Sequence, residues 1–130
     1  MKIYLAARYS RREELLDYRA HLQASGHEVT SRWLHGNHQI DDAGLSVEGE
    51  HKERVRFALE DWEDLEAADT VINFTETPRS TSSRGGRHVE FGAALAMDKR
   101  CIVVGPRENV FHCLPAVEVY ANFDEALAAL

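Results

Sequence analysis

The sequence has 130 residues, a length that suits one domain and is too short for two independent hydrophobic cores. Hydrophobic residues make up 44% of the chain and charged residues 28%, which predicts a folded protein rather than a disordered one. The formal net charge of −7 argues against binding to a nucleic-acid polymer or to an acidic membrane surface. We therefore expect a single domain that spans residues 1–130.

The chain contains no apolar run of the roughly 18 to 20 residues that a membrane span needs. Its first residues have the composition of a strand rather than of a signal peptide. Both features predict a cytoplasmic protein with no membrane partner. Only His35 and His38 approach the spacing of metal ligands, so neither a metal site nor a cofactor is expected.

Five short segments have the composition of β-strands. The first, third and fourth are the most apolar, which is typical of central parallel strands that are covered on both faces. The second alternates between polar and apolar residues and the fifth is short, so both are expected at the edges. The segments are 3–7, 28–33, 70–74, 101–105 and 117–120.

Helices are predicted between these strands and after the last one. Ser10 and Glu13 have the form of a capping box for the first helix, and Gly26 supplies its C-terminal stop. Asn122 and Glu125 form a similar cap for the last helix. The expected helices are 11–25, 47–68, 86–97 and 122–130.

The second expected helix is heavily charged but keeps one apolar stripe, which should face the core. The stripe consists of Val55, Ala58, Leu59, Trp62 and Leu65. The segment before this helix, 34–45, is rich in Gly, Asn, His and Asp and is expected to be a loop. Loops of that length often carry function.

The alternation of strands and helices predicts an α/β fold with helices on both faces of a parallel sheet. Three buried strands and two edge strands favour the flavodoxin-like order 2-1-3-4-5. A ligand in such a sheet binds beyond the carboxyl ends of the strands, near the switch point between the first and third strands. The segments expected there are 7–10, 75–85 and 105–114.

Glu90 is the only charged residue between positions 89 and 97. A helix that is apolar all round is buried, and a buried lone carboxylate is costly unless it is hydrogen-bonded or functional. Small neighbours at Gly86, Ala93 and Ala94 would leave room for a ligand above it. The alternative is a carboxylate that lies exposed near the helix N-terminus, where the helix dipole favours it.

The loop before this helix, residues 79–86, combines hydroxyls, glycines and arginines at a helix N-terminus. Such a composition suits a phosphate or a hydroxyl-rich sugar, although a plain solvated loop would have a similar one. It is not a P-loop, because the Lys-Ser/Thr ending is missing.

Three features together resemble the nucleoside 2-deoxyribosyltransferase family, and the resemblance covers nearly the whole chain. They are the segment 4–7 on the first strand, Asp61 placed eight residues before Asp69, and the segment 86–94 that opens the third helix. Relatives of the family include hydrolases that cut the same bond in nucleoside 5′-monophosphates. The resemblance implies a flavodoxin-like fold, a nucleoside or nucleotide substrate and no cofactor.

The resemblance also implies roles for individual residues. Glu90 would be the nucleophile, Tyr4 on the first strand would orient it, and Asp61 would be an acid near the base. Asn109 matches an asparagine that reaches the sugar 5′-hydroxyl in a neighbouring subunit, so a homodimer or a higher homo-oligomer is expected. Arg8, Ser10, Ser83, Arg84 and Gly86 complete the expected substrate-binding residues.

The chemistry explains these residue types. Breaking an N-glycosidic bond develops positive charge on the sugar, which a carboxylate can stabilise and then capture. Glu90 should therefore be ionised, held so by the helix N-terminus and by a hydrogen bond from Tyr4. Asp61 could protonate the departing base if its neighbours Phe57 and Leu65 raise its pKa. The alternatives are that Asp61 is an ordinary surface charge and that Tyr4 is an ordinary core residue.

The sequence departs from the family at Arg84, six residues before Glu90. Transferases carry an acid at this position and the monophosphate hydrolases a serine, which here lies beside it as Ser83. A cation suits a 5′-phosphate, whereas Asn109 suits a free 5′-hydroxyl, and the match of Asn109 slightly favours the nucleoside.

The first function expected is cleavage of 2′-deoxynucleosides through a glycosyl-Glu90 intermediate, with transfer of the sugar to another base. The alternative within the same chemistry is a nucleoside 5′-monophosphate N-glycosidase, which passes the sugar to water. A further alternative is a noncatalytic nucleotide-binding domain.

Overall fold

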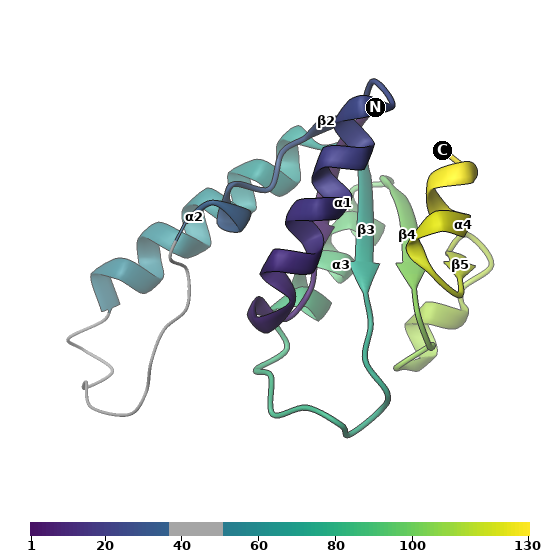
Figure 1. Ribbon diagram of the computed structural model, residues 1–130. Coiled ribbons are helices and arrows are strands. Elements are labelled where there is room, and N and C mark those ends of the chain that lie inside the picture. The colour runs from purple at the N-terminus through teal and green to yellow at the C-terminus, as the bar shows by residue number, and fades with distance from the viewer. Residues whose placement is uncertain (37–50) are drawn as a thin grey trace.

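The computed structural model of the chain describes residues 1–36 and 51–130. Its five strands form one all-parallel sheet in the order β2-β1-β3-β4-β5, with helices on both faces (Figure 1). This arrangement confirms the expected α/β class and strand order. The strands are β1 (Lys2–Ala6), β2 (Glu28–Val29), β3 (Thr70–Phe74), β4 (Arg100–Val104) and β5 (Glu118–Tyr120).

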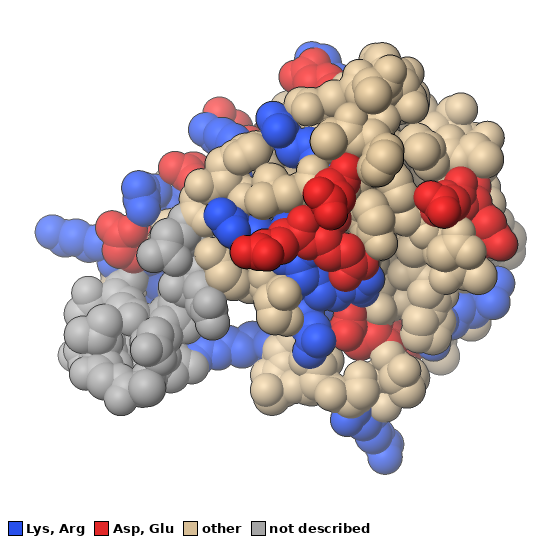
Figure 2. All heavy atoms as spheres, viewed as in Figure 1, with Lys and Arg blue, Asp and Glu red and all other residues tan. Residues whose placement is uncertain are grey.

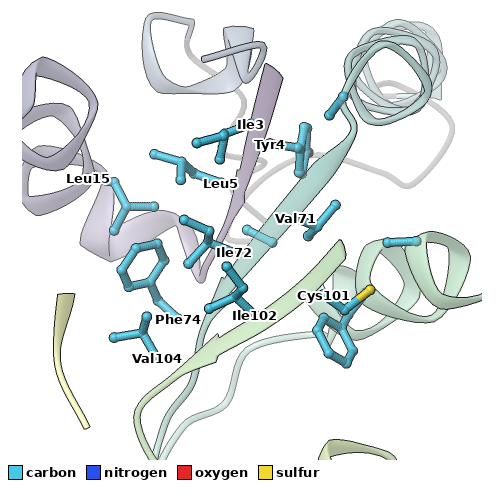
Figure 3. Close-up of a cluster of buried hydrophobic side chains, with 14 of the residues drawn as sticks. Ile3, Tyr4, Leu5, Leu15, Val71, Ile72, Phe74, Cys101, Ile102 and Val104 are labelled. Carbon is cyan, nitrogen blue, oxygen red and sulfur yellow. The ribbon is translucent and has the colours of Figure 1, made fainter. Parts of the chain in front are cut away.

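In the described part of the chain, four α-helices cover the sheet: α1 (Arg12–Ala24), α2 (His51–Ala67), α3 (Gly86–Ala96) and α4 (Phe123–Ala128). Tyr18 of α1 stacks on Phe123 of α4 and on Phe74 of β3, so these two helices cover the same face. The helices α2 and α3 pack on the opposite face. Alternation along the strands divides the core between the two faces, with Leu5 and Ile72 toward α1 and Tyr4 on the opposite side, where α2 and α3 pack (Figure 3).

The start of α1 differs from the expected capping box. Ser10 and Glu13 form no box, because the 3₁₀ turn Tyr9–Arg11 precedes the helix and Arg11 is its N-cap residue, without a side-chain cap. The Arg11 guanidinium instead binds Glu14 at 2.7 Å and so ties the turn to the helix. The C-terminal stop is confirmed, since Gly26 has a φ of 90°, a left-handed conformation that glycine adopts readily.

The last helix begins as expected. The Asn122 side chain accepts a hydrogen bond from the Glu125 backbone N–H at 3.0 Å. The Glu125 carboxylate reaches back to the N–H of Ala121 at 3.2 Å. These two bonds satisfy backbone donors that the start of a helix leaves without an intrahelical partner.

Strand β2 lies at the edge, as expected, but it spans only two residues instead of six. The chain beyond it binds β1 through side chains: the Leu5 N–H donates to Ser31 Oγ at 2.6 Å, and Trp33 Nε1 donates to the Leu5 carbonyl at 2.9 Å. Side chains thus satisfy the backbone groups that a longer strand would pair. The chain then turns into the short 3₁₀ helix Arg32–Leu34.

Helix α2 does not bury the apolar stripe that its sequence predicts. Leu65 is buried, but Val55, Leu59 and Trp62 are 43%, 65% and 44% exposed. The buried face instead includes Asp64, because this carboxylate receives 2.7 and 2.9 Å hydrogen bonds from Arg32. The expected start of this helix at 47–50, and the expected loop from position 37 onward, lie outside the described residues.

None of the helices in the described ranges is both long enough and apolar enough to cross a membrane.

Candidate active site

A polar cleft of about 490 Å³ opens at the carboxyl ends of β1 and β3, beside the start of α3. This is the edge of the sheet where the sequence places the ligand. The loop after β1 and the loop between β3 and α3 form its walls. Six of the expected site residues line it: Arg8, Ser10, Ser83, Arg84, Gly86 and Glu90.

Glu90 and Tyr4 meet at the inner end of this cleft. Tyr4 is fully buried on β1, and Glu90 lies in the second turn of α3 with its Oε2 enclosed. Neither the Tyr4 hydroxyl nor Glu90 Oε2 has a partner at hydrogen-bond geometry among residues 1–36 and 51–130. The two groups still affect each other electrostatically. Burial raises the pKa of Tyr4 well above its ordinary value, and the nearby Glu90 charge adds to that rise.

The Glu90 carboxyl is held in its protonated form by its surroundings. Burial, the largest cause, and the Asp61 charge together raise its pKa to about 8, against the lowering effect of the Tyr4 hydroxyl. This differs from the expectation that the helix N-terminus and Tyr4 keep Glu90 ionised. The reason is that enclosure removes water from the carboxylate, and Tyr4 alone does not replace it.

Asp61 joins the pair from α2. Burial, the largest cause, and the charges of Asp64 and Glu60 together raise its pKa to about 7, against the lowering effect of Arg32. From the sequence, apolar neighbours are expected to raise the pKa of Asp61. In the structure, nearby carboxylates raise this pKa as well. A carboxyl group with a pKa near neutrality is suited to proton transfer at physiological pH.

Two glutamates that the sequence analysis does not identify connect the walls of the cleft. Glu76, after β3, accepts from Arg11 at 2.9 Å and lies 3.4 Å from Arg8. Its backbone N–H donates to Glu108 Oε1 at 2.8 Å, and Glu108 forms a bidentate ion pair with Arg87 of α3. Acidic and basic side chains lie next to one another on the face shown in Figure 2.

These contacts join the loop after β1, the loop after β3, the first turn of α3 and the loop after β4. Arg8 is predicted from the sequence. Arg87 is not, although its place one turn before Glu90, at the start of a helix expected to be buried, is a signal that it needs a counter-charge. Glu108 gives no comparable signal, because its partner is 21 positions away.

The loop after β4 begins at a position that only glycine fits. Gly105 has a φ of 116°, and a Cβ there would lie 2.6 Å from Thr75 Oγ1. The Thr75 hydroxyl donates to the Pro106 carbonyl at 2.6 Å. This approach brings the loop against the end of β3 and places Glu108 within reach of the Glu76 backbone.

Asn109 does not reach the cleft of its own chain. Its side chain accepts from the Phe111 N–H at 3.0 Å and caps the short 3₁₀ helix Val110–Cys113. It lines a separate apolar groove of about 820 Å³ on the outer side of α3, together with Val89 and Phe111. The structure thus separates Asn109 from the other expected site residues.

Within the described ranges, no cluster of three or more His, Cys, Asp or Glu side chains is arranged to hold a metal ion.

The fold is shared with solved structures of known enzymes. The 2-deoxyribosyltransferase of Bacillus psychrosaccharolyticus superposes with a TM-score of 0.72 and 16% identity, over 98% of this chain and 90% of that one. The CMP N-glycosidase BcmB of Clostridium botulinum gives 0.61 and 22%, over 99% and 97%. A conserved protein from Enterococcus faecalis V583 gives 0.63 and 12%, over 98% and 95%.

No family model matches the sequence, and no curated protein is significantly similar to it. The structural likeness, at these identities, establishes the fold. The two enzymes belong to the two groups, transferases and monophosphate hydrolases, to which the sequence resemblance points. The resemblance is thus confirmed at the level of the fold.

Replacing Glu90 with Gln should stabilise the protein in a pH-dependent way. Because the pKa of Glu90 is raised in the folded state, ionisation disfavours folding as the pH rises from about 4.5 to 8. Glu90→Gln removes that penalty, so its free energy of unfolding should exceed that of wild type by on the order of 2–4 kcal/mol at pH 8. The difference should vanish below pH 4.

Urea unfolding at pH 4, 6 and 8 measures this difference. Glu13→Gln, at an exposed position of α1, controls for the loss of one negative charge. Equal stability of wild type and Glu90→Gln at pH 8 would contradict the described environment of Glu90.

Proposed function

We propose that the protein cleaves the N-glycosidic bond of a nucleoside 5′-monophosphate through a covalent glycosyl-Glu90 intermediate. The observation that carries this proposal is an enclosed carboxylate, coupled to Tyr4 and Asp61, at the inner end of a cleft lined by arginines and hydroxyls. A noncatalytic binding domain has no need of such a carboxylate, because its burial is unfavourable.

The reaction would proceed in two steps. In the first, the ionised Glu90 carboxylate forms a bond to the anomeric carbon, and the bond to the base breaks with its electron pair on the base. Asp61 gives its proton to the departing base. In the second step an acceptor attacks the same carbon, releases Glu90, and returns a proton to Asp61.

The raised pKa of Glu90 fits this scheme when the substrate is considered. Positive charge develops on the sugar directly beside the carboxylate, and it favours the ionised form where burial alone opposes it. The carboxylate therefore interacts most strongly with the transition state, as catalysis requires. Tyr4 would hold one oxygen of Glu90 in place during the attack.

The 5′ end of the substrate would lie against Arg8, Ser83 and Arg84, which line the cleft. Arg8 makes only long contacts within the described part of the chain, at 3.4 Å to Glu76 and 3.4 Å to Thr81. Its guanidinium would bind a phosphate more tightly than it binds these groups. Asn109, which favours a free hydroxyl, lies outside the cleft of its own chain.

Transfer of the sugar to a second base is the second candidate, and the superposition with a 2-deoxyribosyltransferase favours it. Both candidates break the N-glycosidic bond through Glu90. They differ in the acceptor, which is water or a second base, and in whether the substrate carries a 5′-phosphate.

Base release from a panel of nucleosides and 5′-monophosphates tests the reaction. We expect at least one 5′-monophosphate to release free base, and Glu90→Ala to reduce the rate by about a thousandfold or more, because the nucleophile is lost. Glu13→Ala is the matched control. A rate for Glu90→Ala within tenfold of wild type would exclude Glu90 as the nucleophile. Repeating the assay with an added acceptor base separates transfer from hydrolysis.

Preference for a phosphate is measured by titrating a matched nucleoside and nucleotide into Glu90→Ala protein. The nucleotide should bind about 10 to 100 times more tightly, because charge-assisted hydrogen bonds hold its phosphate. Arg8→Ala and Arg84→Ala should each reduce that ratio, whereas Arg107→Ala, at an exposed position outside the cleft, should preserve it. Tighter binding of the nucleoside would favour the transferase candidate.

We also propose a homodimer whose interface uses the groove that Asn109 lines. Val89, Val110 and Phe111 beside this groove are 65%, 75% and 62% exposed, and such a surface is unusual on a monomer. A second copy would bring Asn109 to the cleft of its neighbour, as the family resemblance implies. The exposed stripe on α2 provides further apolar surface for the contact.

Sedimentation at micromolar concentration should therefore show a species of twice the monomer mass or larger. Phe111→Glu should convert it to monomer, because a charge in an apolar contact is unfavourable. Ala116→Glu, also exposed, is the control and should leave the assembly intact. A wild-type protein that sediments only as a monomer would contradict the proposal.

A further inference from the structure

Asn73 lies at the centre of the sheet and has no role in the mechanism above. It is fully buried on β3, where its neighbours in register are Ala6 of β1 and Val103 of β4. Both polar atoms of its side chain, Oδ1 and Nδ2, lack a hydrogen-bond partner within residues 1–36 and 51–130. A buried amide without partners is unfavourable, so its presence in an apolar strand needs an explanation.

The strand register puts Asn73 on the same face of the sheet as Tyr4. Tyr4 pairs with Val71 and Ala6 with Asn73, so the two polar residues lie on one side and two residues apart along the strands. Helix α3 covers this side. Asn73 is flanked by Ala6 on β1 and by Val103 on β4, and Ala94 is the buried residue one turn after Glu90 on α3.

Other buried polar atoms without partners in the described part of the chain occur on the same side of the sheet. They include the Tyr4 hydroxyl, Glu90 Oε2 and Arg87 Nε. The opposite face of these strands, by contrast, presents Ile3, Leu5 and Ile72 to α1 (Figure 3). The Asn73 amide can donate two hydrogen bonds, and Glu90 Oε2 is an acceptor that lacks one.

We propose that Asn73 is a positioning residue for Glu90: its side-chain amide donates to Glu90 Oε2 through one water molecule held under α3. The unpartnered atoms supply the polar groups that a buried water requires, and the water would lie beside the small side chains of Ala6 and Ala94. The inference rests on the proposed function only in taking Glu90 as the nucleophile.

This bridge would fix the direction of the attacking carboxylate from below, while Tyr4 contacts it from β1. It would also favour the ionised form, because a hydrogen bond donated to a carboxylate lowers its pKa. Asn73 would thus partly replace the hydration that the ionised Glu90 carboxylate loses on burial. A merely structural asparagine would leave the titration of Glu90 unchanged.

A matched pair of variants, Asn73→Val and Asn73→Thr, tests this role. Valine and threonine have nearly the same shape and both suit a central strand, but only threonine keeps a hydroxyl that can bind the water. Carbon-13 NMR of glutamate-labelled protein follows the Glu90 carboxyl, which Glu90→Gln identifies. The measurement needs no substrate.

Asn73→Val should raise the pKa of Glu90 by about one unit. Asn73→Thr should keep it within about 0.3 of wild type, and so should Ile72→Val, on the same strand but the opposite face. Equal values in all four proteins, or equal rises in the valine and threonine variants, would overturn the proposal. The melting temperature of Asn73→Val should not fall below that of Asn73→Thr, because valine leaves no unpaired polar group.

Kinetics provide the second readout once a substrate is known. The acid limb of kcat/KM should move to higher pH in Asn73→Val and stay in place in Asn73→Thr, while KM changes less than threefold in either. If no substrate is cleaved but the NMR result holds, the positioning role stands and the proposed reaction is wrong. An unchanged pKa excludes the positioning role whatever the activity.

Discussion

The enclosure of one carboxylate, Glu90, is the constraint on which the arrangement of the site depends. A carboxylate removed from water needs donors, a counter-charge or a proton. Here the proton is kept, with a pKa of about 8, and the single donor that interacts with Glu90 in the described residues is Tyr4. The sheet brings Tyr4 to this place because β1 lies beside β3, which α3 covers.

Asp61 shares that constraint from another element. It adds negative charge near Glu90 and so opposes the ionisation of Glu90, while Asp64 and Glu60 oppose that of Asp61. Coupled acids of this kind release their protons in steps that belong to the group. A substrate that develops positive charge between them can therefore change both protonation states together, which suits a reaction needing one carboxylate and one acid.

The arginines around the cleft carry positive charge, and where they are buried they need acidic partners. Arg87 is buried, and a buried guanidinium is tolerated only because Glu108 pairs with it through two hydrogen bonds. Glu108 also accepts from the backbone of Glu76, whose side chain binds Arg11. One chain of ion pairs and hydrogen bonds thus holds three loops and the first turn of α3 around the cleft.

The sequence predicts the central strands and their order well, because β1, β3 and β4 are apolar runs whose burial on both faces leaves few alternatives. It fails at α2, where hydrophobic periodicity would bury Leu59 and Trp62. Periodicity carries no information about Arg32, which holds Asp64 and turns the carboxylate face of α2 inward. The short β2 has a similar cause, since Ser31 and Trp33 bind β1 through their side chains.

The candidate site shows the same limit. Glu90 is conspicuous in the sequence because its neighbours are apolar, and the resemblance adds Tyr4 and Asp61. Glu76 and Glu108 act through pairs that only the folded chain brings together, so local composition cannot identify them. Asn73 is an intermediate case. An asparagine in the middle of an apolar strand is unusual and can be seen in the sequence, but only the strand register shows that it lies on the same side of the sheet as Tyr4.

Asn73 and Glu90 also show that the two faces of the sheet differ in composition and in what they contribute. The face under α1 and α4 is packed with aliphatic and aromatic side chains, which contribute stability without polar cost. The face under α3 accepts an enclosed carboxyl, a buried hydroxyl and an amide that has no partner within the described residues, each of which lowers stability. A strongly apolar first face offsets that cost, and it therefore permits reactive groups to be kept away from water on the second.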